Sequence, residues 1–292
     1  MYRRIITVTF NPAIDKSIYE DKISFDVGGK GINVSKVLKS MNTDSLCVGL
    51  IGKENKNIIY DGLDRLHIDH HFIEVDGKVR TNTKRIINNE LYEENEKGPQ
   101  VTKDKVDELL NMIMQFNNDI VVISGSVPDG VDDNIYAIMT RVLKENNNYV
   151  IVDCDKGLLK NVVKEKPHMI KPNTKEICNL FDCEYDEDRI IEKVRELEID
   201  DVLISKGSAG AILISDKVYA CKPLSVRYKN ALSAGDAMVA AFAYSKLNDM
   251  NKTDALKLSM AAAAACVESD GSKPGDYQRT KQLLKEVEIE IL

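Results

Sequence analysis

The sequence predicts an α/β domain built on a mostly parallel central sheet. Short apolar runs alternate with amphipathic stretches of helical spacing, and this alternation is typical of strand–helix units whose sheet is covered on both faces. In addition, several Gly-rich and Asn-rich segments directly follow a predicted strand. Ligands bind at that end of the strands in such sheets, so we expect the functional site there.

Six strands are predicted from runs of apolar residues bounded by turn formers. They lie at Ile5–Phe10, Ser45–Ile51, Asp119–Ser124, Tyr149–Asp153, Asp201–Ser205 and Ala211–Ile214. Helices are predicted where the residues form amphipathic or Ala-rich stretches. They lie at Val34–Met41, Lys103–Gln115, Asp133–Asn146, Glu187–Leu197 and Ala237–Lys246.

The region from 72 to 95 differs from the rest. Phe72–Val75 and Lys84–Asn88 resemble short strands between polar turns, with few helix formers. This pattern predicts a small antiparallel element packed on the main domain. The chain contains no low-complexity linker, repeat or second composition, so we expect a single domain over residues 1–292.

The composition, 43% hydrophobic and 30% charged, is ordinary for a soluble globular protein. The net charge of −7 argues against a nucleic-acid partner and against an anionic membrane surface. No apolar stretch reaches membrane length, and the six cysteines show no C-x-x-C spacing. We therefore expect a cytoplasmic protein with reduced thiols, in which local basic groups bind any phosphorylated substrate.

The most informative segment is Tyr228–Met238, with the sequence YKNALSAGDAM. Its small residues form a turn that delivers one carboxylate, Asp236, to the start of an Ala-rich helix. A helix start suits a phosphate anion, and an acid beside that anion can take the proton from an attacking hydroxyl. The same residues also fit an S-x-x-D capping box, in which Asp236 reaches back to the N–H of Ser233. This segment alone supports phosphoryl transfer and a structural cap about equally.

A second segment, Val27–Leu38, reads VGGKGINVSKVL. Its three glycines allow a tight turn beside a ligand, Lys30 offers a cation in that turn, and Asn33 faces the same space from a first helical turn. The segment is not a Walker A loop, and it is not a dinucleotide fingerprint because Val34 occupies the third glycine position. The alternative is a glycine turn that carries a surface lysine.

Other candidate residues follow strands. Asp15, in NPAID, places a carboxylate beyond the first strand. The segment KPN-x-x-E (Lys171 to Glu176) suits a nucleotide phosphate and its Mg²⁺, although Asn173 and Glu176 also fit an N-x-x-E helix cap. Weaker hydrogen-bonding segments lie at Arg80–Asn82, Ser124–Ser126 and Ser205–Gly207.

In this order the segments resemble the PfkB (ribokinase-like) family of carbohydrate kinases, from about Ile6 to Gly275. The motifs that match are NPAID, GGKGIN, RTN, SGSVP, KPN-x-x-E and NALSAGD. Three of them, NPA-x-D, GGKG-x-N and KPN-x-x-E, are most similar to the 1-phosphofructokinase and tagatose-6-phosphate kinase branch. The resemblance implies a three-layer ribokinase-like α/β domain with a small β lid, from about 16–27 and 72–95, and a lid that commonly forms a homodimer contact.

The resemblance also implies a role for each matching residue. Asp236 would be the catalytic base, and the backbone N–H groups of Ser233, Ala234, Gly235 and Asp236 would form the anion hole. Sugar hydroxyls would be held by Asp15, Gly29 and Asn33. The phosphate already on the substrate would be bound by Lys30, Arg80 and Ser126. The ATP phosphates and Mg²⁺ would be lined by Lys171, Asn173, Glu176, Ser205 and Gly207, with Asn173 and Glu176 holding the metal through water.

Two features depart from the family pattern. Ser233 stands where the family usually has Gly, and a non-Gly residue with positive φ costs roughly 1–2 kcal/mol there, although its N–H is kept. Only Lys16–Val27 separates Asp15 from Gly28, a shorter stretch than in relatives. We therefore expect either a truncated lid or a lid stretch missing from this chain, and truncation would weaken closure over the substrate.

The predicted activity is Mg·ATP-dependent phosphorylation of a ketohexose phosphate, converting fructose 1-phosphate to fructose 1,6-bisphosphate. The close alternative is a tagatose-6-phosphate kinase. A sugar-phosphate-binding protein with little turnover is an alternative of another class, suggested by Ser233 and the short lid stretch. The third alternative is a kinase of nucleosides or unphosphorylated sugars, which would not need Arg80 because its substrate carries no phosphate.

Overall fold

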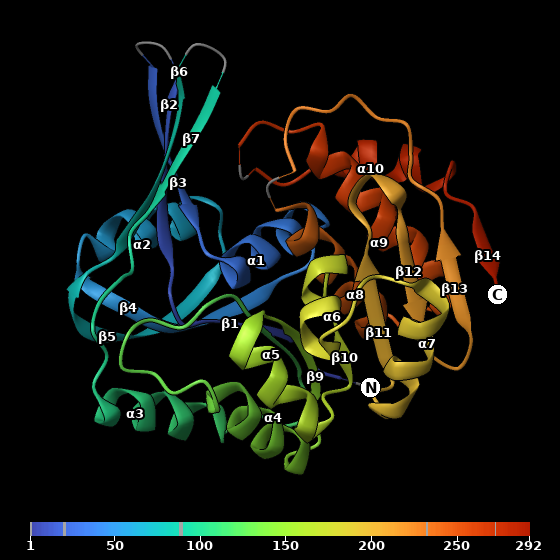
Figure 1. The fold of residues 1–292 in the computed structure, drawn as a ribbon. Helices are drawn as coiled ribbons and strands as arrows, with labels where there is room; N and C mark the ends of the chain where they lie inside the picture. Colours follow the sequence, from blue (N-terminus) through green and yellow to red (C-terminus); the bar gives the residue numbers. More distant parts are fainter. Residues whose placement is uncertain (1, 20–21, 88–89, 232, 272) are drawn as a thin grey trace.

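The computed structural model describes residues 2–19, 22–87, 90–231, 233–271 and 273–292 (Figure 1). Its core is a ten-stranded sheet in the order β14-β13-β12-β11-β10-β9-β8-β1-β4-β5. The strands from β5 to β11 run parallel, whereas β12, β13 and β14 pair antiparallel at one edge. This sheet consists of β1 (Ile5–Thr9), β4 (Ser45–Glu54), β5 (Asp69–Lys78), β8 (Ile120–Ser124), β9 (Tyr149–Asp153), β10 (Met169–Ile170), β11 (Asp201–Ser205), β12 (Ala211–Ile214), β13 (Val218–Cys221) and β14 (Ile289–Ile291).

Helices cover both faces of this sheet, so the predicted α/β architecture is confirmed. Because successive side chains of a strand point to opposite faces, Ile5 of β1 packs in one core layer and Ile6 in the other. The layer of Ile5 is closed by α1 (Lys30–Ser40), α8 (Ala234–Leu247), α9 (Lys252–Val267) and α10 (Tyr277–Leu284). The layer of Ile6 is closed by α3 (Lys103–Ile113), α4 (Ile135–Glu145), α5 (Lys156–Val162), α6 (Thr174–Phe181) and α7 (Glu187–Glu196).

A second sheet of four strands forms the lid, which projects from the body beside α1 and α2 (Lys56–Arg65) (Figure 1). It has the order β3-β2-β6-β7 and consists of β2 (Ala13–Tyr19), β3 (Lys22–Gly28), β6 (Arg80–Ile87) and β7 (Glu90–Asn95). Although Lys16–Val27 is short, it contributes to two antiparallel strands, so a four-stranded lid forms in this chain. The fold is thus a ribokinase-like domain with a small β lid.

The region 72–95 is divided between the two sheets. Phe72–Val75 belongs to β5, which pairs parallel with β4 at the edge of the large sheet. Only the part from Arg80 onward enters the lid, where β6 pairs parallel with β2 and antiparallel with β7. The predicted strand Lys84–Asn88 falls on β6, except that Asn88 lies outside the described residues.

Two helices begin earlier than predicted, and both starts build the site. The first turn of α1 begins at Lys30 rather than at Val34, and that of α8 at Ala234 rather than at Ala237. In each case a residue with positive φ, Gly29 or Ser233, ends the preceding turn as the N-cap. None of the helices in the described ranges is long and apolar enough to cross a membrane.

Candidate active site

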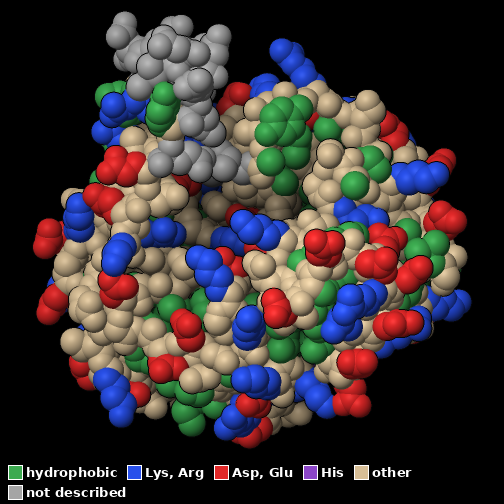
Figure 2. Space-filling model, in the orientation of Figure 1, with side chains coloured by type: hydrophobic (Ala, Val, Ile, Leu, Met, Phe, Trp, Pro, Cys, Tyr) green, Lys and Arg blue, Asp and Glu red, His purple; other side chains and the backbone are tan. Residues whose placement is uncertain are grey.

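Two adjoining cavities lie at the carboxyl ends of the parallel strands. The larger, about 1040 Å³, is lined by ten predicted residues: Lys30, Lys171, Asn173, Glu176, Ser205, Gly207, Ser233, Ala234, Gly235 and Asp236. The smaller, about 230 Å³, is lined by Lys30, Arg80, Ser126 and Glu176 among others. Lys30 and Glu176 line both cavities. Figure 2 shows the hollow between lid and body, with Lys and Arg side chains gathered at its mouth.

Asp236 lies in the first turn of α8 and is 5% exposed. Its Oδ2 accepts a 2.8 Å hydrogen bond from Nδ2 of Asn33, whereas among the described residues no bond joins it to the N–H of Ser233. The capping-box interpretation is therefore wrong. Burial raises the pKa of this carboxyl above its ordinary value, and the nearby Lys30 ammonium opposes that rise.

The first turn of α8 lies against a lysine. A Cβ atom on Gly235 would stand 3.2 Å from Nζ of Lys171, so the missing side chain leaves room for this ammonium group. Lys171 is 4% exposed and lines the larger cavity. The free N–H groups of the turn and this cation together favour a phosphoryl group at the helix start.

The glycine turn packs directly on β1. A Cβ on Gly31 would stand 2.3 Å from Oγ1 of Thr9, so only glycine lets the first turn of α1 approach the end of this strand. The turn carries Lys30 to Oδ2 of Asp153, where Nζ donates a 3.0 Å hydrogen bond. The alternative interpretation treated Lys30 as a surface lysine on a glycine turn, but its bond to Asp153 shows that it is part of the site.

Asp153 was not singled out by the sequence, although it ends a predicted apolar strand. Its side chain is fully buried, and Oδ1 lies 3.4 Å from Nζ of Lys171. Burial alone would raise the pKa of Asp153, but Lys171 and Lys30 outweigh burial and hold that pKa below the ordinary value. The carboxylate is therefore charged and shared between two lysines.

Asn173 and Glu176 form a complete capping box at the start of α6. Oδ1 of Asn173 accepts from the Glu176 N–H at 2.9 Å, and Oε2 of Glu176 accepts from the Asn173 N–H at 2.8 Å. Among the described residues no hydrogen bond to the other Glu176 oxygen, Oε1, is found, and Glu176 lines both cavities, whereas the Asn173 carbonyl is engaged in the cap. No cluster of three or more metal-binding side chains occurs in the described part of the chain. Mg²⁺ fits here if Glu176 holds it through water and phosphate oxygens supply the other ligands.

The lid and the turn before it supply further polar groups near the smaller cavity. Asp15 on β2 accepts a 3.0 Å hydrogen bond from Nδ2 of Asn82 on β6, and Nε of Arg80 donates to the carbonyl oxygen of Asn11 at 3.1 Å. Burial lowers the pKa of Arg80, with Asp15 opposing, but the guanidinium remains charged. Asp15, Gly29 and Asn33 line neither of the two cavities described above.

The apolar half of the larger cavity was missed by the sequence analysis. It comprises Pro223, Leu224, Val226, Met238, Met260, Ala263, Ala264 and Val267. Most of these residues come from the loop after β13 and from α9, whose Ala-rich run was the available signal. Such an apolar slot beside phosphate-binding groups suits a nucleobase.

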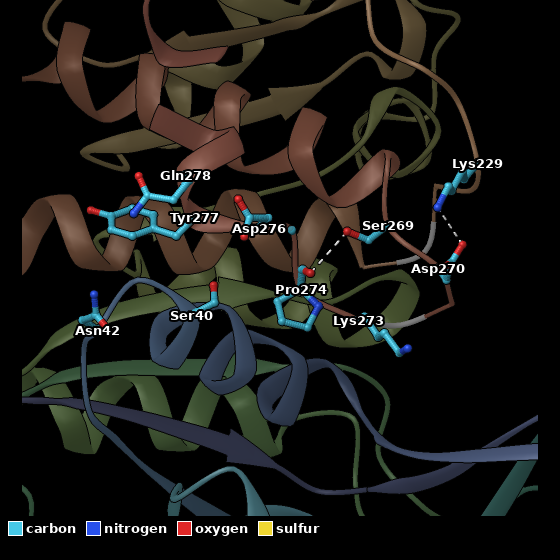
Figure 3. A pocket seen from close by; sticks show the side chains of 11 residues that line it. Ser40, Asn42, Lys229, Ser269, Asp270, Lys273, Pro274, Asp276, Tyr277 and Gln278 are labelled. Atoms are coloured by element: carbon cyan, nitrogen blue, oxygen red, sulfur yellow. Dashed lines mark hydrogen bonds and ion pairs between the residues drawn. The ribbon is translucent and has the colours of Figure 1, made fainter. Parts of the chain in front are cut away.

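A third cavity of about 630 Å³ lies outside the site (Figure 3). It lies between the end of α1 (Ser40) and the segment that joins α9 to α10. Asp270 of that segment forms an ion pair of 2.9 Å with Lys229 of the loop before α8. This cavity shares no lining residue with the other two, and no predicted site residue borders it.

Comparisons with known proteins identify the family and the fold. The model of the pfkB family carbohydrate kinases matches residues 1–277. A 1-phosphofructokinase of Borreliella burgdorferi is 29% identical over 98% of both chains, and a D-tagatose-1-phosphate kinase of Bacillus licheniformis is 30% identical over 98% of this chain and 99% of its own. In fold, phosphofructokinase-2 of Escherichia coli in complex with potassium superposes with a TM-score of 0.91 at 21% identity, covering 98% of this chain and 99% of its own. The chain belongs to the pfkB family of carbohydrate kinases.

Proposed function

We propose that this kinase transfers the γ-phosphoryl group of Mg·ATP to fructose 1-phosphate and forms fructose 1,6-bisphosphate. The observation that carries the proposal is the adjoining pair of cavities. The larger one combines Asp236, a helix start and an apolar slot, and the smaller one adds Arg80 and Ser126. The relatives named 1-phosphofructokinase support this choice of substrate.

Each group has a defined part in an in-line transfer. Asp236 takes the proton from the acceptor hydroxyl, since burial favours its protonated form after the transfer. The N–H groups of the first turn of α8, together with Lys171, stabilise the charge on the transferred phosphoryl group. Glu176 would hold Mg²⁺ through water, and the bound metal would supply positive charge to the ATP phosphates. The apolar slot binds the nucleobase.

The acceptor carries a phosphate because the smaller cavity holds two cations. Lys30 and Arg80 both line it, and Ser126 adds a hydroxyl donor. A kinase of nucleosides or unphosphorylated sugars has no use for this pair. We assign the sugar hydroxyls to Asp15 and Asn33 on the family motifs, although neither residue lines the two cavities.

The substrate is tested with an ADP-release assay on fructose 1-phosphate, tagatose 1-phosphate, tagatose 6-phosphate, fructose 6-phosphate, fructose and adenosine. We expect kcat/KM for fructose 1-phosphate to exceed the others by about tenfold or more, roughly 1.4 kcal/mol. A preference for either tagatose phosphate would keep the mechanism and change the substrate. Binding of sugar phosphates without turnover would instead establish the sugar-phosphate-binding protein.

We also propose that the kinase forms a homodimer through the outer face of the lid. Ile23 and Phe25 alternate on β3 and therefore point to the same face, where their exposed fractions are 57% and 61%. Two large apolar side chains exposed side by side are typical of a surface covered by a partner. A second copy of the lid offers a matching apolar face.

A further inference from the structure

The remaining charged group at the centre of the site is Asp153. It is the last residue of β9, and the described residues that line the two cavities do not include it. Its side chain is fully buried, so it has no direct access to either substrate. Any effect on the reaction must therefore pass through its neighbours.

Those neighbours are two lysines from separate parts of the chain. Oδ2 of Asp153 binds Nζ of Lys30 at 3.0 Å, and Oδ1 lies 3.4 Å from Nζ of Lys171. Lys30 lines both cavities, whereas Lys171 lines only the larger one and lies against the first turn of α8. An ammonium group has three donors, so each lysine keeps donors for a phosphate while it is held by the carboxylate.

We propose that Asp153 is a positioning residue that holds Lys30 toward the acceptor phosphate and Lys171 toward the transferred phosphoryl group. This inference rests on the proposed function. One buried carboxylate thus fixes the separation of two cations that would otherwise repel each other. Rigid placement of such groups is what in-line transfer requires.

Asp201 offers a matched control for a purely structural ion pair. It is also a buried aspartate, and its two oxygens accept from Nζ of Lys252 at 2.5 and 2.6 Å. Asp201 begins β11, whereas Asp153 ends the parallel strand β9, so the two ion pairs lie at opposite ends of the parallel strands. Loss of either carboxylate affects folding, but only Asp153 affects the reaction.

The test compares Asp153→Asn with Asp201→Asn. We expect Asp153→Asn to lower kcat at least about tenfold while AMP-PNP binds as tightly as to wild type or more tightly, because removing a negative charge beside Lys171 favours an anion. Asp201→Asn should lower the melting temperature with kcat within about threefold of wild type. AMP-PNP affinity is measured without sugar, so it tests this inference even if no ketohexose phosphate is turned over and the proposed function fails.

A second comparison applies if Asp153→Asn folds poorly. Lys30→Met combined with Asp153→Asn removes one charge of each sign. Its loss of kcat should be smaller than the product of the two single losses, because part of the effect of Asp153 passes through Lys30. Additive losses would overturn the proposal. A wild-type kcat or weaker AMP-PNP binding in Asp153→Asn would also overturn it. A rise of tenfold or more in the Mg²⁺ concentration needed for half-maximal activity, roughly 1.4 kcal/mol, would do the same, because it would make Asp153 a metal ligand.

Discussion

Asn33 donates a 2.8 Å hydrogen bond from Nδ2 to Oδ2 of Asp236 and thereby joins the first turns of α1 and α8. The amide fixes the orientation of the carboxylate without neutralising it. The glycine turn and the anion turn, which are far apart in the sequence, therefore act as one unit. In the proposed mechanism Asp236 acts as the base, and this role and its burial lead to the first two predictions.

Replacing Asp236 with Asn should lower kcat by on the order of 10²–10⁴ with little change in KM, because the base is lost while the binding groups remain. Steady-state kinetics on the preferred sugar phosphate checks this. Asp254, which occupies the same position in the first turn of α9 and is exposed, is the control, and Asp254→Asn should turn over like wild type. Wild-type turnover by Asp236→Asn would exclude Asp236 as the base.

The same variant should be more stable than wild type at neutral pH. The folded-state pKa of Asp236 is raised, chiefly by burial, so the ionised carboxylate lowers the free energy of unfolding at pH values above both the unfolded and folded pKa. The stability advantage of Asp236→Asn should therefore be full above the folded pKa of Asp236 and should shrink on acidification toward about pH 4, the unfolded pKa of Asp. Melting temperatures across this range check the sign, and a less stable variant at pH 7 would contradict it.

Ser233→Gly should stabilise the fold by about 0.5–1 kcal/mol, since φ is 58° at Ser233 and glycine adopts this conformation without strain. Its kcat should stay near that of wild type, because glycine keeps the backbone N–H. Asn55 is the N-cap of α2 with φ of 63°, and Asn55→Gly should gain less because Asn tolerates this region better. Thermal unfolding of both variants decides, and a lower melting temperature for Ser233→Gly would refute the strain argument.

Glu176→Gln should separate the metal role from the capping role. Gln preserves the capping box, so the melting temperature should hardly change, whereas the Mg²⁺ needed for half-maximal activity should rise by about tenfold or more. Asn173→Ala should do the reverse and lose about 0.5–2 kcal/mol of stability with a smaller change in Mg²⁺ dependence. A Mg²⁺ titration of both variants checks this, and equal Mg²⁺ dependence in wild type and Glu176→Gln would exclude the metal role.

Introducing charge on the outer face of the lid should prevent dimer formation. Ile23→Lys combined with Phe25→Lys should sediment as a monomer under conditions in which wild type is a dimer, because two cations would be buried without partners. Met114→Lys, at an exposed apolar position beyond α3, should leave the dimer intact. A monomeric wild type would refute the dimer itself.

Most of the fold could be predicted because the strands of a parallel sheet are buried on both faces. Strands such as Tyr149–Asp153 and Asp201–Ser205 therefore have the predicted boundaries. The lid could not be predicted in the same way, because its strands are only partly buried. Phe72–Val75 was placed in the wrong sheet, since a short apolar run does not indicate which edge it joins.

The site was predictable where a motif fixes the backbone. The residues from Ser233 to Asp236 line one cavity together with Lys171 and Glu176. Asp153 lacked a motif, because its role depends on two lysines brought close only by folding. The apolar slot was missed for a similar reason, since small apolar residues on α9 resemble ordinary core.

The N-x-x-E segment and Asp236 would be retained to different extents if a descendant of this kinase lost its activity. Glu176 and Asn173 cap α6, so a descendant that no longer transfers phosphate would still need them to fold. Asp236 caps nothing, and its buried charge destabilises the folded chain. Such a descendant would gain stability by discarding it. Among chains of this fold, an intact N-x-x-E therefore indicates a sound α6, whereas a retained aspartate at the position of Asp236 indicates working chemistry.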